Sequence, residues 1–486
     1  MPLLALGLKP LQGDDLVQSS RRLFFDDQPQ RLQVMTVWPR TINSLWGLLL
    51  LGVVWRWVRG LSGTTALASM SMVVFYPPLL AMGGYATTDL AVTALFAAAV
   101  TLFEKARREP SFPAEMVAGV VAALALMAKI EAWALIPVYV LLEIFRPVRP
   151  FPVRRLLSRW GFGVLGAFLT INIMYIPVFL RQEHSMLPIF YYFGHLRKAL
   201  GLSLWDYPYY FLGQARYGTT PFYFPLAFVL KSPLPFLIAL AASIAGLLNR
   251  RIRIPAMFWI TPLAYGLFSF FLPNMGVRLL LPAFPFLAVV AGLGLGWIAT
   301  WRWGRTAGAG RWLAAGLAAW LAIGTLSIFP RHMSYSNEMV PGGSKWKVLG
   351  DFDLDWGQDH QRLAETARRR GWKEIRLAFL GSVDPAFYGV PWRRWTVRDL
   401  QGPQAGCVYA VNAAFVQRGA IIYPIVRPIA EGWIRKARPT GRVGDTWLYY
   451  EIPGEPQEDP TPWLPSAPCF SYTYPPVVTK GEGNKP

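Results

Sequence analysis

The sequence predicts an all-α polytopic membrane bundle of about ten helices, followed by a small C-terminal extracytoplasmic α/β domain. Of the 486 residues, 53% are hydrophobic and only 16% are charged. Several stretches of about 20 residues carry few or no charges, as expected of membrane helices. After about residue 330 these stretches give way to one amphipathic segment and several short β-rich runs.

Ten apolar segments are candidates for membrane helices. The fourth and fifth are short and separated only by AKIEA, so we expect two half-length or steeply packed helices that meet at one face. No repeat of about 20–50 residues, the sign of a solenoid, is present. The segments are 39–58, 64–84, 88–104, 114–129, 131–145, 160–180, 221–248, 256–272, 277–300 and 312–329.

The lysine and arginine residues predict the orientation of the bundle. Alternate loops carry fifteen basic residues, whereas the turns on the other side contribute only Lys129 and Arg278. The Arg-rich loops are therefore expected to be cytoplasmic, and the loop 181–220 and the chain after about residue 330 to lie outside. The fifteen are Arg59, Lys105, Arg107, Arg108, Arg146, Arg149, Arg154, Arg155, Arg159, Arg250, Arg251, Arg253, Arg302, Arg305 and Arg311.

The sequence divides into four parts. In one of them, the predicted α/β domain 330–452, residues 357–371 have an amphipathic pattern that ends at Gly371, which predicts a helix with a glycine C-cap. The runs KEIRLAFLG, GCVYAVNAAFV and DTWLYYEI predict strands. The parts are an external segment 1–38, a transmembrane bundle 39–329 with an external loop 181–220, an extracytoplasmic α/β domain 330–452, and a Pro-rich tail 453–486 that we expect to be poorly ordered.

Composition also excludes some classes of function. The net charge of +20 does not predict nucleic-acid binding, because the basic residues lie between apolar runs rather than along a phosphate-tracking face. Two cysteines, Cys407 and Cys469, and four scattered histidines argue against a structural zinc cluster. Their spacing leaves open whether the cysteines pair.

Several ionisable residues fall at or within the outer half of the predicted bundle. Asp89 follows YATT and is either a helix N-cap alone or a cap that also serves as a base or ligand. Lys129 and Glu131 either neutralise each other or leave Lys129 to meet an anionic phosphate. For Lys231 and Arg278 we favour binding of a lipid phosphate or pyrophosphate over snorkelling to headgroups.

The acidic stretch DFDLDWGQD (351–359) invites comparison with a calcium loop. Such a loop beginning at Asp351 would need glycine at 356 and glutamate at 362, where the sequence has Trp356 and Arg362. We expect the stretch to cap the helix at 357–371 and to dock the outer domain onto the bundle. A role near the acceptor or donor, and a calcium site, are the alternatives.

A family resemblance connects these segments. The chain contains, in order, YATTDLAV, MAKIEAWALIP, YFLGQARYGTTPFYFPLAFVLKSPLP, LPNMGVRLLLPAFPF, HMSYSNEMVPGG and LGDFDLDWGQDHQRLA. This series resembles the family 39-type glycosyltransferases of the GT-C superfamily, which include protein O-mannosyltransferases and the lipid A aminoarabinose transferase. The likeness covers about residues 2 to 400, and KSPLP, SYSNE and DLDWGQD are its most specific motifs.

The resemblance implies a membrane enzyme that moves a sugar from a polyprenyl-phosphate donor to a protein or glycolipid acceptor, on the extracytoplasmic face of a bacterial inner membrane. It places Asp89 as a supporting acid and puts Lys129, Lys231 and Arg278 near the donor phosphate. It gives no metal ligands; metal dependence, sugar, acceptor and oligomeric state stay open. Residues expected toward the acceptor or the outer domain are Asn337, Glu338, Asp355 and Asp359.

The chain also departs from the family. The family's first catalytic acid lies in an external loop upstream of the position of Met1, so we expect the sequence as written to lack a first helix and its primary base, which puts its activity in doubt. Two alternatives follow: a lipid-linked oligosaccharide ligase-type transferase, or a non-enzymatic scaffold or transporter. The absence of an internal repeat argues against the transporter.

Overall fold

The computed structural model describes residues 29–145, 153–180, 187–201, 208–302, 308–381, 385–422 and 427–455. Contacts divide the chain into two compact units, which we describe separately. The helical unit comprises residues 39–207 and 217–342, and the C-terminal unit comprises 208–216 and 343–486 together with 1–38. The segment 1–28, the tail beyond residue 455 and Cys469 lie outside the described residues.

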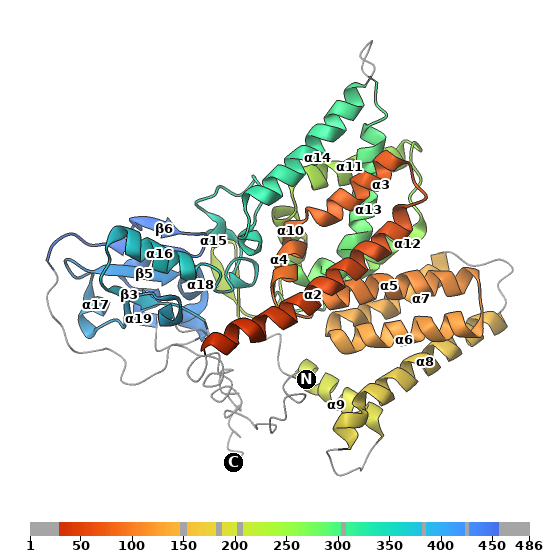
Figure 1. Cartoon of the computed structure of the whole chain (residues 1–486), viewed down its shortest axis with the longest axis horizontal. Coiled ribbons are helices and arrows are strands. Elements are labelled where there is room, and N and C mark those ends of the chain that lie inside the picture. Colours follow the sequence, from red (N-terminus) through yellow and green to blue (C-terminus); the bar gives the residue numbers. More distant parts are fainter. Residues whose placement is uncertain are drawn as a thin grey trace, which may run out of the picture. The chain divides into compact units, whose positions relative to one another are not determined.

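The helical unit is a bundle of apolar helices (Figure 1). Its elements follow the predicted segments, with two of these bent and one further helix in the predicted loop 181–220. They are α2 (Pro29–Val58), α3 (Gly63–Val74), α4 (Pro77–Gly84), α5 (Asp89–Arg108), α6 (Phe112–Ala128), η3 (Ile130–Ala134), α7 (Leu135–Phe145), α8 (Val153–Phe179), α9 (Pro188–Gly201), α10 (Tyr223–Lys231), α11 (Leu234–Leu248), α12 (Ala256–Ser269), η4 (Val277–Ala283), α13 (Phe284–Ile298), α14 (Ala309–Ser327) and η5 (His332–Ser334).

Several helices are long and apolar enough to cross a membrane. Within the described residues there are four such spans, or up to six if the bent pairs α3–α4 and α10–α11 each count as one. This is fewer than the ten predicted segments, because α6 and α12 are shorter apolar helices, α7 has only 11 residues, and α5 carries Asp89 at its start and four charged residues near its end. The chain is an integral membrane protein, and its predicted fold class, a helical bundle with a small C-terminal α/β part, is confirmed.

The span Val277–Ile298, formed by η4 and α13, lies at the centre of the bundle. It is 83% buried, whereas the other three long spans are between 17% and 28% buried. Glycines allow its neighbours to come close: a Cβ on Gly292 or Gly296 would collide with α3, and one on Gly294 with α11. Small residues at helix contacts let backbones approach in membranes, where packing rather than water drives association.

We therefore expect Gly292→Ala to destabilise the bundle. The new methyl would lie 2.1 Å from Oγ and 2.5 Å from Cα of Ser69, so α3 and α13 must separate. Overpacking of this kind costs about 1–3 kcal/mol. The thermal unfolding temperature of the purified protein in detergent should fall clearly. Gly52→Ala is the matched control, because nothing lies within 4 Å of a Cβ at that position in α2; equal unfolding temperatures for the two variants would contradict the packing argument.

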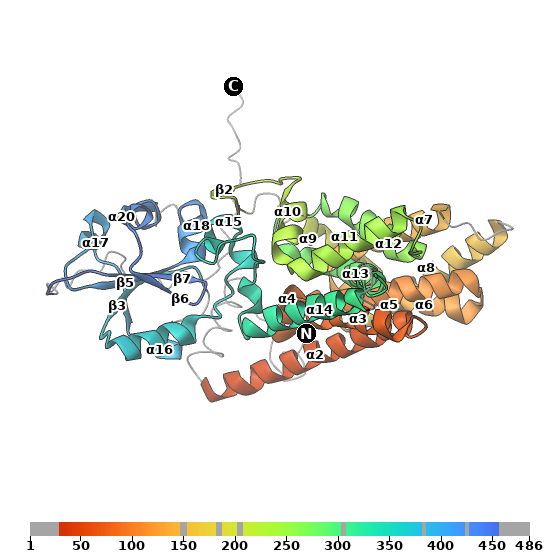
Figure 2. The same ribbon diagram turned by 90° about the horizontal axis from the view of Figure 1, so that it is seen from above.

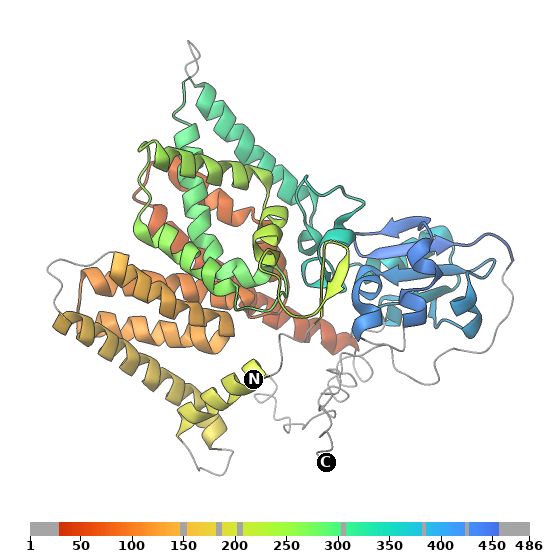
Figure 3. The ribbon, with the colours of Figure 1, turned by 180° about the vertical axis from the view of Figure 1, so that it is seen from behind.

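The segment 181–220, which the sequence analysis treats as a loop, contains structure. Helix α9 packs on α8, and its Tyr192 hydroxyl donates to the carbonyl oxygen of Leu126 in α6. Part of this aromatic-rich segment is thus used in helix packing. The same segment also forms the hairpin β1 (Tyr209–Phe211) and β2 (Gln214–Arg216), which belongs to the C-terminal unit and contacts α15 and α18 there (Figure 3).

The C-terminal unit is a three-layer α/β structure (Figure 2). Its sheet has the order β4-β3-β5-β7-β6, in which β3 is parallel to β4 and β5, and β7 is antiparallel to both of its neighbours. Its elements are α15 (Lys345–Val348), η6 (Asp351–Asp353), α16 (His360–Arg370), β3 (Ile375–Ala378), η7 (Pro385–Tyr388), β4 (Trp392–Arg393), α17 (Val397–Gln401), β5 (Val408–Asn412), α18 (Ala413–Ile422), α19 (Arg427–Ala430), α20 (Trp433–Lys436), β6 (Gly441–Val443) and β7 (Trp447–Glu451).

Alternating side chains supply a core to each face of the sheet. Ile375 and Leu377 pack with α16, whereas Ala378 faces the core formed with α18, α19 and α20. The predicted helix and three strands are confirmed as α16, β3, β5 and β7, and Gly371 ends α16 with a positive φ of 68°. Such a left-handed residue is the usual glycine C-cap.

Candidate functional site

A buried carboxylate at the start of α5 is the centre of the candidate site. Asp89 is 1% exposed and is the first residue of α5, with Thr88 at the N-cap position and no side-chain capping hydrogen bond. The expected N-cap role is therefore not what its side chain does. Instead, Oδ1 of Asp89 lies 2.7 Å from Nζ of Lys129, and Oδ2 lies 3.8 Å from a guanidinium nitrogen of Arg278.

Lys129 occupies the junction between two short helices. It is the C-cap residue of α6, with an extended backbone (φ −166°, ψ 152°), and the chain then turns into η3. Its ammonium also lies 2.8 Å from Oε1 of Glu131, so it connects two carboxylates. Neutralisation of Lys129 by Glu131, one of the two readings of the sequence, does occur, but Asp89 shares the same cation.

Arg278 is placed by a turn that needs glycine. Gly276 has a φ of 97° and precedes η4, and its N–H donates to the hydroxyl of Tyr223 at 3.0 Å. Positive φ at this value is readily adopted by glycine alone. Tyr265 donates to the carbonyl oxygen of Leu279 at 2.6 Å, and Nε of Arg278 donates to the carbonyl oxygen of Met275 at 3.3 Å. These bonds fix the helix on which Arg278 is carried.

The charges of this cluster are arranged in depth. The side chains of Asp89 and Glu131 are 1% and 3% exposed, whereas those of Lys129 and Arg278 are 20% and 17% exposed. The two carboxylates therefore lie underneath, and the cations form the accessible face. An anion that approaches meets positive charge first, in a setting where carboxylates hold both cations in place. Such a face can bind a phosphate through charge-assisted hydrogen bonds.

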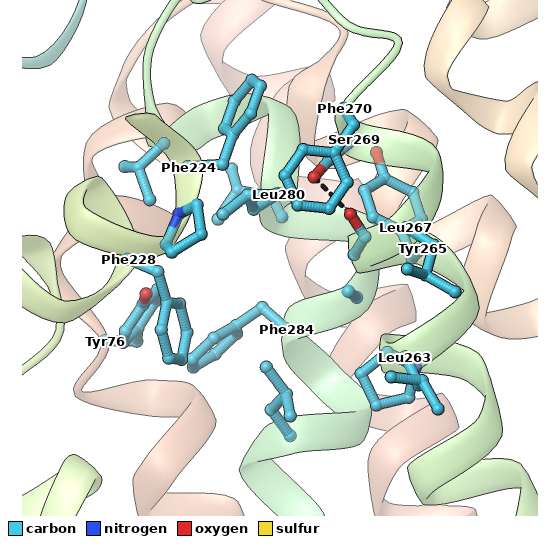
Figure 4. Close-up of a pocket in the computed structure, with 17 residues that line it drawn as sticks. Tyr76, Phe224, Phe228, Leu263, Tyr265, Leu267, Ser269, Phe270, Leu280 and Phe284 are labelled. Carbon is cyan, nitrogen blue, oxygen red and sulfur yellow. Dashed lines mark hydrogen bonds between the residues drawn. The ribbon is translucent and has the colours of Figure 1, made fainter. Parts of the chain in front are cut away.

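An apolar cavity of about 300 Å³ is lined by η4 and by the helices α10, α12 and α13 (Figure 4). Val277, which precedes Arg278, and Leu280, two residues after it, contribute to its wall. Hydrocarbon side chains dominate its lining, and polar groups are few. This cavity was not predicted, because it forms from Tyr76, just before α4, and from residues of α10, α12, η4 and α13 that look like ordinary membrane-helix residues. Its aromatic and hydroxyl residues include Tyr76, Phe224, Phe228, Tyr265, Ser269, Phe270 and Phe284.

Lys231 and Asn337 have contacts at the sharp bend between α10 and α11, where the helix axes turn by 113°. The ammonium of Lys231 donates to the carbonyl oxygen of Met333 at 2.8 Å, and the residue is 2% exposed. Asn337, 1% exposed, donates to the carbonyl oxygens of Val229 and Ser232. Both residues thus join the segment after α14 to the end of α10. Glu338 is exposed and accepts a hydrogen bond from Trp320.

The acids of DFDLDWGQD fix loops of the C-terminal unit. Asp355 accepts hydrogen bonds from the N–H of Gly357 and from the amide of Asn412. Asp359 accepts from the N–H of Asp445 and the hydroxyl of Thr446. It occupies the N-cap position of α16 without a side-chain capping bond, so the expected capping role is wrong and the carboxylate holds the β6–β7 turn instead.

No group of three or more histidine, cysteine, aspartate or glutamate side chains within the described ranges is placed to hold a metal ion. Cys407 is buried and forms no disulfide with a residue that the structure describes. Among the described residues, the acids Asp355 and Asp359 therefore accept hydrogen bonds in turns and belong to no group of metal ligands.

The environment of His360 predicts that acid destabilises the C-terminal unit. Its Nδ1 lies 2.8 Å from the carbonyl oxygen of Gly357, whereas Nε2 is buried without a hydrogen-bond partner among the described residues. Burial lowers the pKa of His360 and raises that of Asp359 beside it. Below the unfolded-state histidine pKa of about 6.5, the unfolded chain binds a proton at His360 more readily than the folded unit does. The free energy of unfolding therefore falls as the pH falls.

We accordingly expect acid to loosen the sheet as the pH falls below about 6.5 in the wild type. The His360→Gln variant should lose this dependence, while Asp359, whose raised pKa acts with the opposite sign, stays in both proteins. Hydrogen exchange of β3 and β5, corrected for the intrinsic effect of pH on exchange, measures the change locally. Identical pH profiles for wild type and variant would show that His360 does not cause it.

Comparisons with known proteins give matches among solved structures alone. No protein-family model and no curated protein matches the chain. The crystal structure of ArnT from Cupriavidus metallidurans bound to undecaprenyl phosphate matches with a TM-score of 0.42 and 14% identity, over 85% of this chain and 83% of that chain. The apo form of the same protein matches with a TM-score of 0.39 and 13% identity, over 84% and 82%. ArnT is a member of the family that the sequence resembles. At this identity and TM-score, the functional argument rests on the residues of the chain itself.

Proposed function

We propose that the chain is a membrane glycosyltransferase that takes its sugar from a polyprenyl-phosphate donor. The observation that carries the proposal is that one short helix, η4, contributes both to a cationic face and to an apolar cavity. Arg278 of η4 contacts Asp89, while its neighbours Val277 and Leu280 line the cavity. A lipid phosphate has a matching division into an anionic head and a hydrocarbon chain.

The proposed chemistry assigns roles to three side chains. An acceptor hydroxyl attacks the anomeric carbon, the bond from that carbon to the phosphate oxygen breaks, and polyprenyl phosphate departs. Lys129 and Arg278 stabilise the charge that develops on the departing phosphate. Asp89 is a positioning residue, since its buried carboxylate is committed to both cations; the acceptor proton is released to water. We keep Lys231 out of the phosphate site because its ammonium is buried and bonded to a carbonyl oxygen.

The test supplies purified protein with a panel of polyprenyl-phosphate sugars and with membranes from a strain that lacks the gene, which contain the unmodified acceptor. Mass spectrometry should detect released polyprenyl phosphate together with a mass gain of one sugar on a protein or a glycolipid, which also identifies the acceptor. Nucleotide sugars serve as the control donor. Transfer from a nucleotide sugar, with none from any lipid-linked donor, would falsify the proposal.

We further propose that transfer occurs on the extracytoplasmic side of a bacterial inner membrane, with the C-terminal unit on the same side. The excess of arginine in alternate loops supports this orientation. In a cysteine-free background, Gly342→Cys should react with a membrane-impermeant thiol reagent in intact cells, whereas Asn249→Cys, beside the Arg-rich loop after α11, should react only after the cells are broken. The reverse labelling pattern would invert the proposed orientation.

A further inference from the structure

A second cavity, independent of the proposed transfer site, lies within the C-terminal unit. Its volume is about 720 Å³, within the range of roughly 300–1,000 Å³ typical of small-molecule pockets. Residues of the β1–β2 hairpin, α15, α18, the segment from α19 to Pro439 and β7 line it. The hairpin and the sheet belong to the same unit, so the cavity is complete within it.

Positive charge collects around this cavity. Lys347, Arg435, Lys436 and Arg438 line it, and all four are exposed. Among the described lining residues the one acid is Glu431, which lies 3.6 Å from Arg427. Arg435, Lys436 and Arg438 form no salt bridge with any residue that the structure describes. Basic side chains that line one cavity without described counter-ions favour an anionic ligand.

The rest of the wall is fixed and partly apolar. The amide of Gln417 donates to the carbonyl oxygens of Trp346 and Leu349, which holds α15 against α18. Tyr450 donates to the carbonyl oxygen of Ile434, which fixes α20 against the sheet. A pocket whose shape is fixed by such bonds loses little entropy on binding.

The aromatic residues of the wall distinguish between ligands. Tyr210 and Tyr450 are 8% and 3% exposed, so neither presents a full ring face. The ring of Trp346 is half-buried, and the ammonium of Lys347 lies 5.4 Å from its centre. A planar base therefore finds no open ring on which to stack. A saccharide, with its C–H faces and hydroxyl groups, suits a wall that mixes apolar side chains with polar ones.

We propose that this cavity binds an anionic saccharide, that is, a sugar bearing a phosphate or a carboxylate group. The arginines and lysines contact the anionic group, and the half-buried apolar residues of the wall, Trp346, Val416 and Ile421, contact the sugar ring. The binding does not rest on the proposed transfer reaction.

Direct binding to the purified full chain, in an uncharged detergent that contains no sugar, tests the proposal. The probes are glucose 6-phosphate, glucuronic acid, glucose, inorganic phosphate and AMP, each titrated by saturation-transfer NMR. Glucose 6-phosphate and glucuronic acid should bind at least about tenfold more tightly than glucose or phosphate, because charge and ring both contribute. Phosphate binding as tightly as glucose 6-phosphate would reduce the site to an anion site, and tighter binding of AMP would make it a nucleotide site; either result overturns the proposal.

Variants locate the binding. Arg435→Gln and Arg438→Gln should each weaken glucose 6-phosphate binding by about tenfold, which corresponds to the loss of one charge-assisted contact. Arg369→Gln removes the same charge from an exposed position on α16; it is the matched control and should leave the affinity for glucose 6-phosphate unchanged. Arg278→Ala should also leave this binding unchanged, which separates the cavity from the transfer site. Loss of binding in Arg278→Ala, or full affinity in the double variant Arg435→Gln/Arg438→Gln, refutes the assignment.

Discussion

Replacing Arg278 with alanine is expected to abolish sugar transfer and to leave membrane insertion intact. The guanidinium belongs to the accessible face of the charge cluster, where it is 17% exposed above the buried Asp89. Removing one preorganised donor to a developing anion typically lowers kcat by about 10²–10³-fold. The measurement is the rate of polyprenyl phosphate release by equal amounts of monodisperse wild-type and variant protein.

Two controls separate this role from general damage. Arg311→Ala removes an exposed arginine from the first turn of α14 and should keep wild-type activity. Arg278→Lys keeps the charge but loses the planar fork, so an intermediate rate is expected. Normal turnover by Arg278→Ala would show that the cluster does not hold the donor phosphate.

A double-mutant cycle tests whether Asp89 acts through the cations. Asp89→Asn leaves Lys129 with Glu131 but removes the carboxylate that holds Arg278. If Asp89 positions Arg278, the double variant Asp89→Asn/Arg278→Ala should be little slower than Arg278→Ala alone, because residues that act as a unit are not additive. Multiplied losses in the double variant would instead give Asp89 a separate role.

Local pattern predicted those parts of the fold that depend on local sequence. The helix ending at Gly371 and the strands in KEIRLAFLG, GCVYAVNAAFV and DTWLYYEI were all predictable, because period and capping residues act within a few positions. Strands β4 and β6 were not, since two or three residues carry no period. The hairpin β1–β2 was hidden in an aromatic segment whose partners lie more than 130 residues later, as the bridge between Phe211 and Leu349 illustrates.

The candidate site was predictable in its residue types but not in its contacts. The sequence indicated charge pairing near an outer surface from one acid and three cations. Three of these four residues, Asp89, Lys129 and Arg278, do meet. Sequence alone could not show that Lys231 instead bonds a backbone carbonyl, or that Asp359 holds a turn 86 residues away. Those outcomes depend on which helices are neighbours, which hydropathy does not encode.

The second large effect is expected at the other end of the bundle, where removal of Glu143 should strongly destabilise the fold. Its carboxylate lies 3.4 Å from Arg107 of α5 and 2.9 Å from Arg159 of α8, and all three side chains are less than 10% exposed. The sequence analysis counted both arginines as loop residues that set orientation. The structure buries them in helices α5 and α8, where Glu143 of α7 links them.

Glu143→Ala leaves the buried guanidinium of Arg159 without the carboxylate that lies 2.9 Å from it, and leaves Arg107 with the more distant Glu104, at 3.8 Å. Breaking a buried ion pair in this way costs about 3–5 kcal/mol, far more than the pair contributes relative to apolar residues. Thermal unfolding of the detergent-solubilised protein should show a large fall in unfolding temperature, and Glu109→Ala, an exposed acid just after α5, should show almost none.

The size of this effect depends on the stranded charges, and that can be tested separately. Glu143→Met combined with Arg107→Met and Arg159→Leu removes these three charges and keeps similar volumes, while Glu104 keeps its pairing with Arg108 at 3.5 Å. If the loss in Glu143→Ala comes from uncompensated arginines, the triple variant should recover most of the unfolding temperature, since apolar residues often replace buried ion pairs without loss. If the triple variant is as unstable as Glu143→Ala, the network stabilises the bundle through its hydrogen bonds, such as that from Arg107 to the carbonyl oxygen of Leu142, rather than through charge balance.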